Sequence, residues 1–152
     1  MQFSPGDLVE IETTGGLAYA QITHIHPAYP EVLRILKGLH AARPADLRQL
    51  DQRPTAFVTM FPLASALDRQ ELAGRKVGSL TVSSEHKAFP TFKMPIYDKR
   101  GNVAYWWLWD GDGLTYKVDL DGSYDAYPRR EVPTVAEFLR DIRMLNAAEA
   151  VA

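Results

Sequence analysis

The chain has 152 residues, a net charge of −2, a hydrophobic share of 46% and no cysteine. This length suits one domain that buries roughly 68–70% of the surface of its unfolded chain, and the ordinary composition excludes disordered and fibrous proteins. The lack of cysteine excludes disulfides, thiol nucleophiles and zinc–thiolate sites, and it fits a reducing compartment.

The chain shows no targeting signal and no basic surface character. Its opening residues lack a basic or apolar leader, and no stretch approaches the length of a membrane span, so we expect a cytoplasmic protein with no membrane partner. Phosphate contacts need a basic surface, whereas the pI is near 6.1. The composition therefore argues against nucleic acid and favours a protein or a small ligand as the partner.

The segment 5–27 predicts a β-hairpin. Two alternating segments, 8–12 and 17–26, flank a Gly-Gly turn, and alternation of this kind is typical of half-buried strands. The period of two places His24 and His26 on the same face of the second strand.

The middle of the chain alternates between short strands and short helices. We expect strands at 31–38 and 55–61 and short helices at 45–51 and 63–70. Two prolines interrupt 78–95, so this stretch is expected to be a loop or an edge strand.

A β-meander follows, with strands at 92–97, 103–109 and 114–118. Both faces of its middle strand are apolar, so this strand should lie in the centre of the sheet with Trp106 and Trp107 buried on opposite sides. The three tryptophans are expected to fill core, although Trp109 borders a turn and could be partly exposed beside it.

The last predicted element is a helix with an apolar stripe that covers the sheet. Thr134 and Glu137 form its capping box, and the stripe contains Val135, Phe138, Leu139, Ile142 and Leu145. We therefore predict a single α+β domain over residues 1–146, in which a bent antiparallel sheet, partly barrel-like, is covered by the C-terminal helix and short helices. Residues 147–152 form a tail that is expected to fray.

The histidine pair is a candidate metal site. His24 and His26 could reach one divalent ion, but a catalytic metal needs a third protein ligand, from His40, His86 or a carboxylate. No such ligand stands at a diagnostic spacing, and no nucleophile motif or phosphate-binding loop is present. We expect no metal, no cofactor and no catalytic residue.

Five aspartates gather between residues 110 and 125, beside glycines that are typical of turns. The spacing does not match a calcium loop, because Leu114 and Thr115 stand where an oxygen ligand and a glycine are needed. Several acidic turns at one end of a sheet would steer a basic partner toward it. The predicted partner-binding residues are Trp109, Asp110, Asp112, Asp119, Asp121, Tyr124, Asp125 and Tyr127.

Several separated motifs resemble, in order, the bacterial immunity protein 26 family, which is also labelled phosphotriesterase-like. The motifs are PGDLVEI at 5–11, GLAYAQITHIHP at 16–27, RP at 43–44, MFPL at 60–63 and WWLWDG at 106–111. The resemblance implies a small cytosolic protein that binds and neutralises the cognate toxin of a polymorphic toxin system. It carries over no catalytic residue.

Three functional hypotheses follow. The first is a non-enzymatic immunity protein that occludes a toxin, and the second is a metal-dependent phosphoester or phosphotriester hydrolase that uses His24 and His26. The third is a peptide- or RNA-binding module, because the first hairpin resembles SH3-like and Tudor-like hairpins. The third hypothesis would be favoured if five basic residues clustered on one face of the protein. These residues are Arg34, Lys37, Arg43, Arg48 and Arg53.

Overall fold

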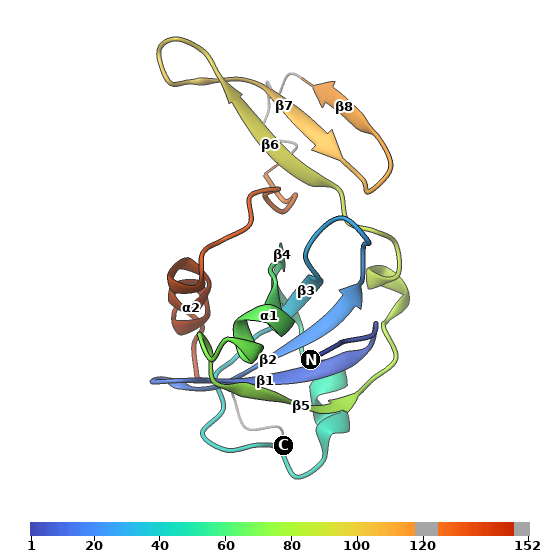
Figure 1. Ribbon diagram of the computed structural model, residues 1–152, viewed down its shortest axis with the longest axis vertical. Coiled ribbons are helices and arrows are strands. Elements are labelled where there is room, and N and C mark those ends of the chain that lie inside the picture. Colours follow the sequence, from blue (N-terminus) through green and yellow to red (C-terminus); the bar gives the residue numbers. More distant parts are fainter. Residues whose placement is uncertain (118–124, 148–152) are drawn as a thin grey trace. The chain divides into compact units, whose positions relative to one another are not determined.

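The computed structural model describes residues 1–117 and 125–147 and shows a mixed α+β fold with two antiparallel sheets (Figure 1). The chain forms two compact units. The first unit comprises Met1–Ser83 and the segment that starts at Val132, and the second unit comprises Ser84–Glu131. The second unit is thus inserted between two segments of the first, and the single domain expected over 1–146 stays a prediction.

The first unit contains a five-stranded antiparallel sheet in the order β4-β3-β2-β1-β5. Its edge strands β4 and β5 do not pair with each other, so the sheet is not closed into a barrel. Helix α1 (Leu63–Asp68) follows β4 and separates it along the chain from β5, the strand at the other edge. The strands are β1 (Asp7–Thr13), β2 (Gly16–His24), β3 (Val32–Leu36), β4 (Thr55–Met60) and β5 (Gly74–Ser79).

The predicted first hairpin is confirmed, because β1 and β2 pair with Val9 opposite Ala20 and Glu10 opposite Tyr19. Strand β5 pairs with β1 as an edge strand, but it begins at Gly74, before the stretch that the prolines had marked. The approach is close: a Cβ on Gly74 would lie 2.3 Å from the carbonyl oxygen of Glu10. Glycine is therefore required where β5 crosses β1.

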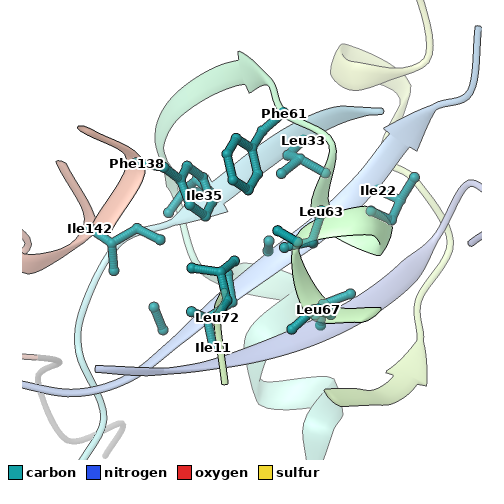
Figure 2. Close-up of a cluster of buried hydrophobic side chains, with 14 of the residues drawn as sticks. Ile11, Ile22, Leu33, Ile35, Phe61, Leu63, Leu67, Leu72, Phe138 and Ile142 are labelled. Atoms are coloured by element: carbon teal, nitrogen blue, oxygen red, sulfur yellow. The ribbon is translucent and has the colours of Figure 1, made fainter. Parts of the chain in front are cut away.

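Helices α1 (Leu63–Asp68) and α2 (Val135–Arg143) cover one face of this sheet and enclose its main core (Figure 2). Phe138 of α2 stacks on Phe61 with ring centroids 4.1 Å apart, and both rings are buried. The predicted capping box at the start of α2 is present, with reciprocal hydrogen bonds between Thr134 and Glu137. The final helix therefore packs on a sheet as predicted, and that sheet is the one that contains the first hairpin.

The opposite face of the same sheet is covered as well. Leu8, Tyr19, Leu36 and Leu50 form a second buried cluster, in which Leu50 comes from the 3₁₀ helix η1 (Leu47–Gln52). Strand β1 is consequently buried on both faces from its first residue to Ile11, and the half-buried strand that alternation predicted is wrong. The helix predicted at 45–51 forms as this 3₁₀ helix, capped by the side chain of Asp46.

The second unit contains a three-stranded antiparallel sheet in the order β6-β7-β8. Its strands are β6 (Phe92–Tyr97), β7 (Val103–Trp109) and β8 (Leu114–Lys117), preceded by the 3₁₀ helix η2 (Ser84–His86). The predicted central position of the tryptophan strand is confirmed, because β7 pairs with both neighbours.

The three tryptophans of β7 differ in burial. Trp106 is buried as predicted, whereas Trp107 is half-buried. Trp109 is only 8% exposed, so it fills core as expected and the alternative of partial exposure does not hold. The reason is local packing: the ring of Phe89 lies 5.3 Å from that of Trp109, edge to face, and the guanidinium of Arg130 lies 5.1 Å from its centroid.

The C-terminal segment is tied to the first unit as far as Ala147. The amide of Leu39 donates to the carbonyl of Asn146 at 2.9 Å, and Leu39 and Ala147 form a β-bridge. Ala147 therefore does not belong to a frayed tail, and residues 148–152 lie outside the described part of the chain.

Candidate functional site

A group of exposed large apolar side chains lies on the sheet of the second unit. Tyr105 and Trp107 of β7 and Tyr116 of β8 form a ring cluster with centroids 5.6–6.3 Å apart. Met94 of β6 lies opposite Trp107, and Leu114 lies on the same face of β8 as Tyr116. Tyr116 is 63% exposed and Leu114 is 58% exposed. We call these five residues the aromatic face.

Alternation and pairing explain why the aromatic face exists. Residues 105, 107 and 109 of β7 point to one side of the sheet, and their cross-strand partners point to the same side. At one end of this side Phe92 and Trp109 are covered by Phe89 and Arg130. Leu114 lies opposite Trp109 at that same end but is 58% exposed, and the rest of the aromatic face follows toward the other end.

On the opposite side of the same sheet Trp106 and Leu108 are buried, whereas Thr115 and Lys117 are exposed. Lys93 is buried, its Nζ donates to the carbonyl of Asp125 at 3.1 Å, and it lies 5.0 Å from the ring centroid of Trp106. Backbone hydrogen bonds from Lys93 to Pro128 and from Arg130 to Lys93, both 2.8 Å long, hold the segment 125–130 beside β6. Sequence patterns did not indicate this buried lysine.

The acidic turn between β7 and β8 is built by Asp110. Its Oδ1 accepts hydrogen bonds from the amides of Gly113 at 2.9 Å and Asp112 at 3.0 Å, which lower the pKa of the Asp110 carboxyl. Both aspartates are exposed. This arrangement is ordinary turn chemistry, and it holds a negative charge at the end of β7.

The predicted partner-binding residues fall into three groups. Asp110 and Asp112 lie in the β7–β8 turn and Trp109 is buried beside it, whereas Asp125 and Tyr127 are exposed in the segment beside β6. Asp119, Asp121 and Tyr124 lie outside the described residues.

The two candidate metal-binding histidines have local hydrogen bonds. His24 Nδ1 lies 2.9 Å from the hydroxyl of Thr23, and His26 Nδ1 accepts from the amide of Ala28 at 3.0 Å. The strand ends at His24, and the ring of His26 packs on Tyr29 with centroids 4.9 Å apart. Within residues 1–117 and 125–147, no group of three or more histidine or carboxylate side chains could hold a metal ion.

Sequence analysis missed a buried ionic network on the second face of the first sheet. Glu10 is buried, accepts the Tyr19 hydroxyl at 2.8 Å, and is bound by Arg43 through Nε at 2.8 Å and Nη2 at 3.0 Å. Arg43 holds the pKa of Glu10 below its usual value, and burial together with the hydrogen bond to Glu10 raises the pKa of Tyr19. The only available signal was a charged residue inside an apolar strand opposite a tyrosine.

The basic residues of the third hypothesis are largely engaged in the fold. Arg34 is buried and donates to Gln21 at 2.8 Å, to Thr55 at 3.0 Å and to the carbonyl of Arg53 at 3.4 Å. Arg43 binds Glu10, and Arg48 binds Asp46 at 2.9 Å. Lys37 is exposed beside Pro54, to whose carbonyl its amide donates. Arg34, Arg43 and Arg48 are thus paired with partners within the fold.

No helix in the described part of the chain is long and apolar enough to cross a membrane. Comparison of the chain with known protein families, curated proteins and solved structures found no match.

Proposed function

We propose that this cytoplasmic protein is a non-enzymatic, immunity-type binding protein that neutralises a cognate bacterial toxin by occlusion. The observation that supports the proposal is the aromatic face, which presents large apolar side chains to solvent on two neighbouring strands of the second sheet. Tyrosine, tryptophan and methionine are enriched at protein interfaces, and tyrosine and tryptophan are among the residues that dominate the binding energy there. Contiguous exposed apolar residues of this kind mark interaction sites.

The geometry of the rings favours a protein over a nucleic acid. The planes of Tyr105, Trp107 and Tyr116 are inclined to one another by 64–70°. Stacking of bases needs rings that offer their flat faces along a common track. Inclined rings instead leave an uneven apolar surface, into which the side chains of a partner protein can pack.

The charge beside the aromatic face indicates the kind of protein. Asp110 and Asp112 are exposed in the turn that joins β7 to β8, the two strands that carry the rings. A negative turn beside an apolar surface raises the association rate of a basic partner and disfavours acidic ones. The proposed partner is therefore a basic toxin domain.

The hydrolase hypothesis depends on a metal held by His24 and His26. Elemental analysis of the purified protein tests it directly, and we expect no stoichiometric transition metal, because two imidazoles alone do not complete a catalytic site. One equivalent of zinc, nickel or manganese that is lost when both histidines are changed to alanine would replace the binding hypothesis with the hydrolase.

The aromatic face is tested by binding to the toxin encoded beside this gene. The double variant Leu114→Ser with Tyr116→Ser removes two exposed side chains, so it leaves the packed side of the sheet intact. We expect a dissociation constant at least about tenfold weaker, mainly through faster dissociation. Ile25→Ser, at an exposed residue of the first unit, is the matched control. Equal affinity for the double variant and the wild type would exclude this face as the interface.

The acidic turn is tested in the same assay by changing Asp110, Asp112, Asp119 and Asp121 to asparagine. Asparagine keeps the side-chain oxygen that accepts the turn hydrogen bonds at Asp110. We expect a slower association whose dependence on salt is weaker than that of the wild type. An unchanged association rate at both low and moderate salt would refute the electrostatic part of the proposal.

A further inference from the structure

A groove with a volume of about 590 Å³ opens on the first unit, next to η1. This volume lies within the range of roughly 300–1,000 Å³ that is typical of sites for small molecules. The groove is lined by Asp46, Arg48, Gln49, Gln52, Arg53 and Pro54.

Most of the side chains that line the groove carry N–H donors. Two guanidinium groups and two carboxamides supply many N–H donors, against a single carboxylate, and no lining residue is aromatic. Donors of this kind recognise planar oxyanions, whereas a nucleobase or another aromatic ligand would need a ring or an apolar wall on which to stack.

Asp46 shows how a carboxylate fits against Arg48. The Nη2 atom of Arg48 lies 2.9 Å from Oδ2 of Asp46, and its Nε lies 3.1 Å and 3.2 Å from the two carboxylate oxygens. Asp46 also accepts the backbone amide of Arg48 at 3.0 Å as the cap of η1. The Arg48 side chain is exposed, and this pair shows that its Nε and Nη2 edge can bind a planar carboxylate.

The surroundings of Arg53 are positively charged and partly buried. Arg53 is half-buried, and its backbone carbonyl accepts a hydrogen bond from buried Arg34. Burial and the charge of Arg53 lower the pKa of His40, whose Nε2 is buried without a hydrogen-bond partner among the described residues. A negative charge in the groove would be stabilised by these positive, partly buried surroundings.

We propose that the groove is a binding site for a small carboxylate ligand, contacted by Arg48 and Arg53 and by the amides of Gln49 and Gln52. The choice of a carboxylate over a phosphate monoester rests on the fit that the structure shows, in which the planar carboxylate of Asp46 lies against the Nε and Nη2 edge of the Arg48 guanidinium. The site belongs to the first unit and the aromatic face to the second.

The test is a titration of the full chain, followed by the NMR signals of the backbone amides and the histidine rings. The probes are sodium succinate, phenyl phosphate and the uncharged succinamide, with ionic strength held constant by sodium chloride. We expect succinate to cause saturable shifts at Gln49, Gln52 and Arg53 and at the ring of His40. Succinamide should cause none.

Variants assign the effect to the groove. Arg53→Gln should weaken succinate binding by about tenfold or more, and Arg48→Gln, at an exposed side chain, should weaken it several-fold. Arg69→Gln is the control, because Arg69 is exposed and its ion pair with Glu71 is 4.0 Å long. The proposal is overturned if the shifts grow linearly with succinate, if phenyl phosphate binds more tightly than succinate, or if Arg48→Gln and Arg53→Gln both bind like the control.

Discussion

Replacement of Phe138 by alanine tests whether α2 is part of the core of the first unit. Phe138 is completely buried, and its ring stacks on Phe61 with an interplanar angle of 10°. Removing a buried phenyl group costs about 3–5 kcal/mol, because the transfer energy is lost and a cavity is left. Domains of this kind are stable by about 5–15 kcal/mol. We therefore expect Phe138→Ala to lower the thermal midpoint by roughly 6–20 °C.

Urea unfolding, followed by circular dichroism and by amide hydrogen exchange in β1, β2 and β3, measures this effect where it should occur. Tryptophan fluorescence reports the unfolding of the second unit, because all three tryptophans belong to that unit. Met144→Ala, at an exposed residue just after α2, is the control and should change stability by no more than about 0.5 kcal/mol. A loss below about 1 kcal/mol for Phe138→Ala would refute the docking of α2 on this core.

Two further predictions concern a charge and a ring. Arg43 lowers the pKa of Glu10 below its usual 4.5 in the folded protein, so the ionised carboxylate stabilises the fold above that pH and loses this contribution as the pH falls. The stability difference between wild type and Glu10→Gln, measured in urea at several pH values, should shrink below about pH 4.5; a difference that grows on acidification would contradict the ion pair. Trp106→Ala should cost about 3–5 kcal/mol, because Trp106 is buried under Lys93, and Trp107→Ala, at a half-buried ring, about 1–2 kcal/mol. The reverse order in urea unfolding would show that the buried side of β7 has been misassigned.

Local patterns predicted the elements well because each depends on neighbours in the sequence. Alternation and the Gly-Gly turn specified the first hairpin, and the apolar strand with tryptophans on both faces lies in the centre of its sheet. The capping box at Thr134 and Glu137 marked the first turn of α2, where both hydrogen bonds form within one turn of helix.

The candidate sites were harder to predict because they depend on contacts between distant segments. Arg43 lies 33 residues from Glu10, and nothing in either local sequence indicates that the two side chains meet. The sequence of β8 did not indicate that its apolar side chains are exposed, since Leu114 alternates in the same way as buried residues do. Burial of Trp109 likewise requires Phe89 and Arg130, which approach it from opposite directions along the chain.

The interrupted first unit has a consequence for its synthesis. Phe61 is made before the inserted second unit, and Phe138, which covers it, is made after. At elongation rates of about 5–20 residues per second, roughly 4–15 s separate the two phenylalanines on the ribosome. During that interval the core face of the five-stranded sheet lacks its second helix and exposes apolar surface to other nascent chains and to chaperones. The order of translation thus makes the first-made unit the last to be completed.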